Sequence, residues 1–179
     1  MHRASVSGST ATRLAKLAQW NALPPEQAAQ QILACCGSDA WAAALALKRP
    51  VFTEEALLAL AAEVWESLPP EEWQQAFDSH PRLGEAHAVR ATAASLTWSA
   101  EEQAQALPTE ALRHANRRYE EKFGRVFLFC ASGRTTDEIL AALHRRMQND
   151  AETEWRVAGD EQRRITGLRL ERWLGEDGA

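Results

Sequence analysis

Residues 109–124, with the sequence TEALRHANRRYEEKFG, show most clearly what this chain is built from. Leu112 and Tyr119 are seven residues apart, a spacing that places both on one face of an α-helix. Thr109 belongs to the residue types that cap a helix N-terminus, and Gly124 suits the left-handed turn that commonly ends a helix. The stretch therefore predicts an amphipathic helix with its apolar face toward a core.

Similar signals recur on both sides of this stretch. Proline pairs at 24–25 and 69–70 can each open a helix, and Ser38 and Thr53 can cap two more. Thr135 and Glu138 have the spacing of a capping box, in which side chain and backbone bond reciprocally at a helix start. Most of the chain is therefore predicted to be helical.

The C-terminal part predicts one long helix that breaks near Gly159. Ile165, Leu168 and Trp173 are predicted to face inward along it. The short apolar run at 126–131 has no second strand to pair with, so we interpret it as a buried connector or a helix start.

These patterns predict an all-α fold, a single-domain helical bundle of about eight helices. We assign residues 1–20 to an N-terminal extension, 21–175 to the helical domain and 176–179 to a tail. The chain has 179 residues, a length that fits one domain with a core of its own.

Composition excludes several classes of protein. The net charge of −5 gives nucleic-acid binding no electrostatic basis. No apolar run approaches the roughly 20 residues of a membrane span, and no signal peptide is recognisable. Three cysteines, Cys35, Cys36 and Cys130, fit neither a disulfide framework nor a zinc site. We therefore expect a cytoplasmic protein that binds neither nucleic acid nor membrane.

The stretch DSHPRLGE at 78–85 is the best candidate for chemistry. Pro81 disfavours a helical backbone at His80, and Gly84 permits a turn that other residues resist. Histidine exchanges protons near neutral pH. A histidine on a stiff bend indicates a positioned acid or base, although a loop histidine bonded to a carboxylate fits equally well.

Two other candidates also have a purely structural interpretation. Ser99 and Glu102 have the spacing of a capping box, which needs no function behind it. Arg169 can be an ion-paired helix residue or a fixed clamp for a carboxylate. Cys130 lies in an apolar run, where thiols are usually inert, and is interpreted as a packing residue.

Two alternative functions remain open at this point. A metal-dependent hydrolase would use His80, Glu85 and His87, although their spacing matches no helix-borne metal motif. A non-catalytic helical interaction module would instead show a sizeable exposed apolar patch.

Several motifs occur in one order along the chain. They are His-Pro-Arg-Leu-Gly at 80–84, Ser-x-x-Glu-Gln at 99–103, Phe-Leu-Phe-Cys at 127–130 and Ile-x-x-Leu-Arg-Leu at 165–170. With this combination the chain resembles the 2-oxo-4-hydroxy-4-carboxy-5-ureidoimidazoline (OHCU) decarboxylases of urate breakdown, from about residue 21 to residue 174.

The resemblance implies an all-helical domain, commonly a homodimer, that decarboxylates OHCU to (S)-allantoin without a metal or organic cofactor. It implies catalytic roles for His80 and Glu102, and we hypothesise that His80 donates the proton. It implies that the following residues bind substrate: Pro81, Ser99, Gln103, Phe127, Leu128, Phe129, Cys130, Ala131 and Arg169.

Overall fold

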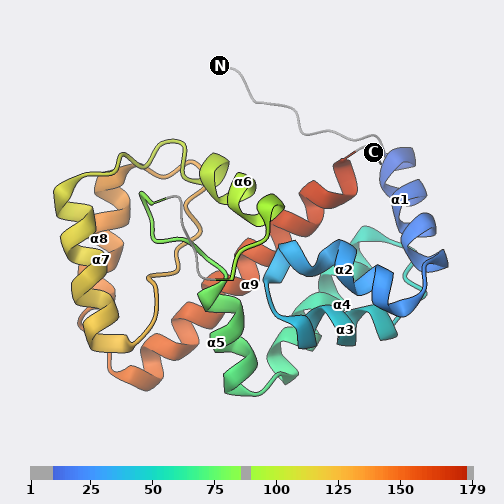
Figure 1. Cartoon of the computed structure of the whole chain (residues 1–179), viewed down its shortest axis with the longest axis horizontal. Helices are drawn as coiled ribbons and strands as arrows, with labels where there is room; N and C mark the ends of the chain where they lie inside the picture. The colour runs from blue at the N-terminus through green and yellow to red at the C-terminus, as the bar shows by residue number, and fades with distance from the viewer. Residues whose placement is uncertain (1–9, 86–89, 177–179) are drawn as a thin grey trace.

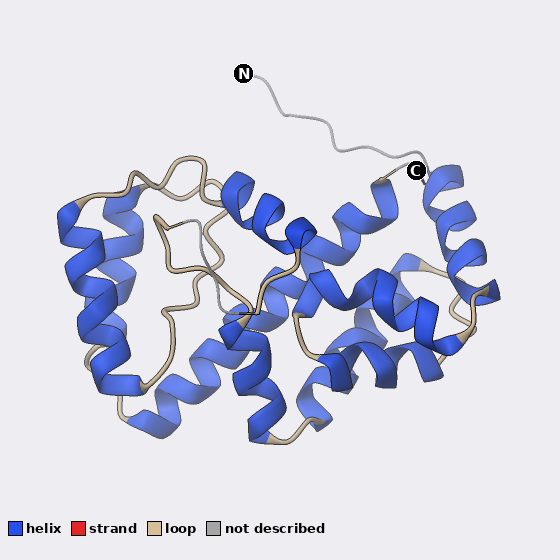
Figure 2. Cartoon of the chain, viewed as in Figure 1, coloured by secondary structure: helices blue, strands red, loops and turns tan. Residues whose placement is uncertain are grey.

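The computed structural model describes residues 10–85 and 90–176, and within these ranges the chain forms nine α-helices and no strand (Figures 1 and 2). The helices are α1 (Thr10–Ala22), α2 (Pro25–Cys36), α3 (Asp39–Leu47), α4 (Glu54–Ser67), α5 (Pro70–Asp78), α6 (Ala93–Glu102), α7 (Glu110–Phe123), α8 (Thr136–Arg146) and α9 (Ala151–Gly175). None of the described helices is long and apolar enough to cross a membrane.

The 25-residue helix α9 runs along most of the molecule (Figure 1). The larger apolar cluster packs α1 to α5 against its C-terminal two thirds, and the smaller cluster joins α7, α8 and the connector that precedes α8. Helices α5 and α6, with the loops that follow them, lie between these two parts (Figure 1). The bend at His80 therefore falls between the two apolar clusters.

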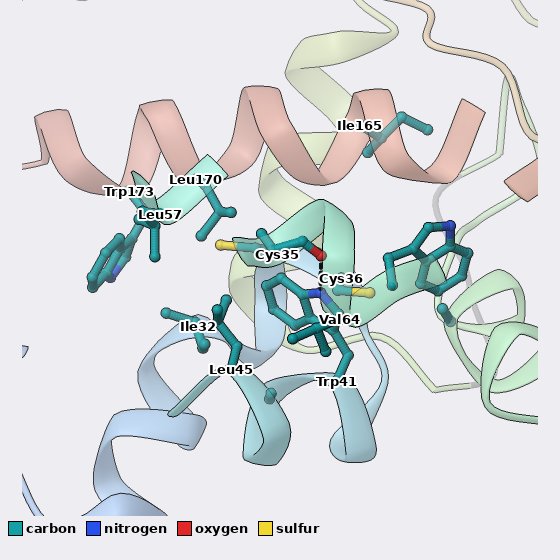
Figure 3. Close-up of a cluster of buried hydrophobic side chains, with 14 of the residues drawn as sticks. Ile32, Cys35, Cys36, Trp41, Leu45, Leu57, Val64, Ile165, Leu170 and Trp173 are labelled. Carbon is teal, nitrogen blue, oxygen red and sulfur yellow. Dashed lines mark hydrogen bonds between the residues drawn. The ribbon is translucent and has the colours of Figure 1, made fainter. Parts of the chain in front are cut away.

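Buried tryptophans dominate the larger cluster, part of which is drawn in Figure 3. A buried indole N–H requires an acceptor, and three of these indoles donate to a backbone carbonyl of another helix. Trp41 donates to Ala61 O at 3.1 Å, and Trp65 donates to Gly159 O at 3.1 Å. These bonds fix the relative register of α3, α4 and α9.

The helix starts and stops follow the sequence signals closely. The Thr109 hydroxyl accepts from Leu112 N at 3.2 Å, and Gly124 adopts φ +69° after α7. Thr135 and Glu138 form the predicted capping box at α8. Residues 126–131 form a connector without helix or strand, which confirms one of the two interpretations of that run.

Residues 10–20, assigned above to an N-terminal extension, form most of helix α1. Leu17 and Trp20 are buried, and the Trp20 indole donates to Ala28 O at 2.9 Å. We missed this helix because α1 has no acidic residue in its first turn and few apolar residues to mark its buried face. Residues 1–9 lie outside the described ranges.

The predicted break near Gly159 is wrong, since α9 is continuous from Ala151 to Gly175. The glycine serves packing instead. A Cβ atom built at Gly159 would come within 2.2 Å of Trp73 Cζ3, and a rigid indole cannot yield that much space. Because Gly159 has no side chain, α9 can lie directly against the indole of Trp73 on α5.

We expect Gly159→Ala to destabilise the protein by about 1–3 kcal/mol, because overpacking a close contact outweighs the gain in helix propensity. Gly167→Ala on the same helix is the matched control. A Cβ at Gly167 has no atom within 4 Å, so this change should stabilise by roughly 0.5–1 kcal/mol. Urea denaturation of both variants would measure this, and stabilisation by Gly159→Ala would contradict the packing argument.

Candidate active site

The bend that carries His80 begins where α5 ends. His80 N donates to Phe77 O at 3.1 Å, which closes the last turn of the helix. Gly84 then adopts φ +83°, and its N–H donates to Gln103 Oε1 at 2.9 Å. The Ser-x-x-Glu-Gln motif therefore holds the far end of the His-Pro-Arg-Leu-Gly bend directly.

The near end of the bend is held against the end of α2. Gly37 closes α2 with φ +86°, and a Cβ there would lie 2.1 Å from Ser79 Oγ. Ser79 is buried and donates to Ala76 O at 2.7 Å, so it cannot move aside. Only glycine permits this approach, which places His80 next to the C-terminal turn of α2.

Arg169 on α9 joins three elements around this point. Its guanidinium forms a bidentate pair with Glu102, at 2.9 Å for both bonds. It also donates to Ser99 Oγ at 2.8 Å, to Ser95 Oγ at 3.1 Å and to Ala34 O at 3.3 Å. These five bonds use all five guanidinium N–H groups.

The capping-box interpretation of Ser99 and Glu102 is wrong, because α6 begins earlier and ends at Glu102. Thr92 is the actual N-cap, and its hydroxyl accepts from Ser95 N at 3.1 Å. Ser99 and Glu102 instead lie on one face of the last turn and both bind Arg169. Spacing alone could not distinguish these cases, because a three-residue separation occurs in every helical turn.

The Arg169 side chain is 1% exposed and forms an ion pair with Glu102, as one of its two interpretations expected, while substrate binding by Arg169 stays a prediction. A substrate carboxylate could reach its guanidinium only by displacing one of the present bonds. Leu168, predicted to face inward, is instead 43% exposed. The interior stripe of α9 is partly polar here, which an apolar periodicity cannot reveal.

His80 is 6% exposed and lies in a strongly desolvating environment. The pKa of its imidazole is lowered to about 3, mainly by burial and also by the positive charge of Arg169, while hydrogen bonding with Gln162 opposes the shift. The free protein therefore holds His80 as a neutral imidazole at physiological pH. A neutral imidazole can accept a proton as a base, and it must gain that proton before it can donate one as an acid.

This environment predicts an acid-sensitive stability. Below about pH 6.5 the unfolded chain protonates His80 while the folded protein does not, down to about pH 3, so stability falls as the pH is lowered through this window. We expect His80→Asn to lose less stability than the parent protein between pH 7 and pH 5. Melting temperatures at the two pH values would measure it, and equal losses would contradict a buried neutral histidine.

The connector at 127–131 is bonded to α9 at Glu161, the residue before Gln162. Phe127, Leu128 and Ala131 are buried, whereas Phe129 and Cys130 are partly exposed. Cys130 N donates to Glu161 Oε2 at 2.8 Å, so this backbone donor is already occupied. Burial raises the pKa of the Cys130 thiol, in agreement with a packing role.

The motif analysis missed Gln162, a fully buried residue on α9. Its side chain contacts His80 and donates to Cys36 O at 3.2 Å and to Thr166 Oγ1 at 3.1 Å. Gln162 and Arg169 are seven residues apart and share one helix face with Thr166. Polar residues at this helical spacing were the signal that could have identified it.

The metal-site alternative gains no support from the described part of the chain, which contains no group of three or more potential metal ligands. His87, one member of the proposed cluster, lies outside the described residues. A cavity of about 120 Å³ lies beside the bend, lined in part by Ser79, Ser95 and Arg90, and does not include His80 among its lining residues.

The fold and the site together define a class, an all-helical domain in which a buried neutral histidine sits beside an Arg–Glu pair and a polar helix end. The family model of the OHCU decarboxylases matches residues 21–171. The chain belongs to the OHCU decarboxylase family.

Individual relatives agree with this assignment. The chain is 34% identical over 143 residues to the uric acid degradation bifunctional protein TTL of Arabidopsis thaliana, covering 76% of this chain but 44% of that protein. It is 32% identical over 132 residues to the 2-oxo-4-hydroxy-4-carboxy-5-ureidoimidazoline decarboxylase of Haloferax volcanii, covering 72% and 77% of the two chains. The chain thus spans less than half of the Arabidopsis protein.

Solved structures share the architecture. A crystal structure of an OHCU decarboxylase in the presence of (S)-allantoin superposes with a TM-score of 0.64 at 30% identity, covering 80% of this chain and 96% of that one. A structure of (S)-allantoin synthase, at 21% identity and a TM-score of 0.63, supports the fold.

Proposed function

We propose that this protein decarboxylates OHCU to (S)-allantoin in uric acid degradation. The observation that carries the proposal is the meeting of two separate family motifs, through the bond from Gly84 N to Gln103 Oε1, beside the buried His80 and the Arg169–Glu102 pair. Family membership supplies the substrate.

The chemistry of the substrate requires little from the protein. As its name states, OHCU bears a hydroxyl and a carboxyl group on C4, so the double bond of the imidazoline ring lies between C5 and a nitrogen. When CO2 leaves, its bonding electron pair forms a C4=C5 bond, and the C=N pair moves to the ring nitrogen, which takes up one proton. The ring is its own electron sink, so the reaction needs no electron-accepting cofactor.

The remaining step moves one proton. The C4 hydroxyl must lose its proton to become the ring carbonyl of allantoin, and C5 must gain one on a single face. A neutral His80 can accept the hydroxyl proton and, as imidazolium, return it to C5. The hypothesis of His80 as proton donor is therefore refined, because this histidine must first act as a base.

Glu102 restricts the orientation in which the substrate can bind, and Gln103 holds the neighbouring bend through Gly84 N. Both carboxylate oxygens of Glu102 accept hydrogen bonds from Arg169, which fixes the orientation of this acceptor group. The ureido group offers N–H donors, so Glu102 at the rim of the site is its natural partner. Pro81, Ser99 and residues 127–131 remain proposed substrate contacts.

Adding the protein to freshly oxidised urate, after the hydrolysis step that yields OHCU, tests this function. Circular dichroism follows the handedness of the allantoin formed. We expect faster conversion and a single hand, (S). A racemate formed at the spontaneous rate would overturn the proposal, and activity that disappears on exhaustive chelation would favour the metal-dependent alternative.

A homodimer and a cytoplasmic location stay predictions. Cys35 and Cys36 are adjacent, buried and free, and burial raises the pKa of the Cys36 thiol to about 12, which suits a reducing compartment. Light scattering of the purified protein would measure its oligomeric state.

A further inference from the structure

Two buried polar atoms near the proposed reaction centre lack a hydrogen-bond partner within the described part of the chain, one on His80 and one on Gln162. His80 Nε2 and Gln162 Oε1 are both buried, and neither has a hydrogen-bond partner among the described residues. A buried polar atom left without a hydrogen-bond partner is unfavourable, so two such atoms on neighbouring side chains are expected to bond to each other. Gln162 donates to Cys36 O, next to the Gly37 turn that packs against Ser79, and hydrogen bonding with Gln162 opposes the lowering of the His80 pKa, so the two side chains lie beside each other.

The orientation of the Gln162 amide is not arbitrary. Its Nε2 faces the backbone carbonyl of Cys36 at 3.2 Å, and a carbonyl can only accept. A second bond to Thr166 Oγ1 at 3.1 Å holds the same nitrogen. The amide oxygen therefore points away from α2, and it can only accept a hydrogen bond.

The opposite ring nitrogen of His80 is in a different situation. Nδ1 is not among the buried atoms without a partner, and it forms no hydrogen bond to a described residue. If Nε2 carries the proton and donates it to Gln162, Nδ1 is the ring nitrogen that keeps a lone pair and can act as a base.

We propose that Gln162 is a positioning residue, which accepts a hydrogen bond from His80 Nε2–H and so presents Nδ1 to the substrate as the base. The inference deepens the proposed decarboxylation and rests on it for the identity of the proton that is moved. Gln162 touches His80 and acts through it. It fixes both the tautomer and the plane of the ring, because a flipped ring would place the Cε1–H group, and no N–H donor, against the amide oxygen.

The wild-type protein provides the first test. In a long-range ¹H–¹⁵N spectrum of protein labelled with ¹⁵N-histidine, the signals of His80 are those absent from His80→Asn. We expect a proton on Nε2 alone at pH 7, and the same neutral form at pH 5, where exposed histidines are charged. A proton on Nδ1, or on both nitrogens at pH 7, would overturn the proposal.

A variant supplies the second test. Gln162→Leu keeps the approximate volume and removes the acceptor, so we expect kcat to fall roughly ten- to hundredfold from misorientation of His80, with KM changed less than about threefold. The His80 signals should shift toward a mixture of tautomers. Ile165→Val, a buried change on the same helix, controls for loosened packing and should keep kcat. An unchanged kcat in Gln162→Leu would refute the role.

The two tests separate this inference from the proposed function. The spectrum reports the His80–Gln162 bond whether or not the protein acts on OHCU. A protonated Nε2 without turnover would reject the activity alone, whereas turnover with the opposite tautomer would reject the role of Gln162 alone.

Discussion

Replacing His80 with Asn should lower the turnover of OHCU by at least about 10²-fold and up to about 10⁴-fold, the usual contribution of a positioned acid–base group. Asparagine cannot accept and return a proton near neutral pH. It is smaller than histidine and can adopt the same bend, so the fold should persist. Initial rates of (S)-allantoin formation by circular dichroism would measure the loss.

Folding and general histidine effects need separate controls. Far-ultraviolet circular dichroism and the melting temperature at pH 7 should show that His80→Asn is folded. His144→Asn on α8 changes an exposed histidine and should leave turnover unaltered. Normal turnover by folded His80→Asn would remove His80 from the mechanism.

Replacing Arg169 with Met should destabilise the protein by about 3–5 kcal/mol, the cost of breaking a buried ion pair by removing one partner. The Glu102 carboxylate would lose its guanidinium partner, and Ser95 and Ser99 would lose their donor. Loss of the positive charge should also raise the pKa of His80, since Arg169 lowers it. Urea denaturation would measure the change in stability.

Arg172, one turn further along α9, is the matched control. Its ion pairs with Glu101 and Glu176 are partly exposed, so Arg172→Met should cost less than about 1 kcal/mol. The double variant Arg169→Met with Glu102→Leu should be more stable than Arg169→Met alone, because it leaves no buried charge without a partner. Equal losses for Arg169→Met and Arg172→Met would contradict the buried pair.

The sequence predicted local structure well at positions where a residue type has one common structural role, such as capping a helix or forming a turn. Thr109 and Thr135 cap helices, and Gly84 turns the bend, as expected. These signals act within a few residues of chain, so no tertiary information is needed to interpret them. The fold class followed from the same local patterns.

Features that depend on distant partners were not predictable in this way. Gly159 carries the signal of a helix break, but its partner is an indole 86 residues earlier, and the helix continues. Ser99 and Glu102 have the spacing of a cap, but their partner Arg169 lies about 70 residues away. Gln162 belongs to no motif, and only the folded contact with His80 indicates its role.

One consequence concerns the protein during synthesis. The guanidinium of Arg169 bonds to a carbonyl 135 positions earlier in the chain, at Ala34, and to the end of α6. Chains are made from the N-terminus, and domains fold as units once enough of the sequence has emerged. A ribosome-bound nascent chain still lacking Arg169 therefore cannot assemble a competent reaction centre, however much of its N-terminal half is already helical.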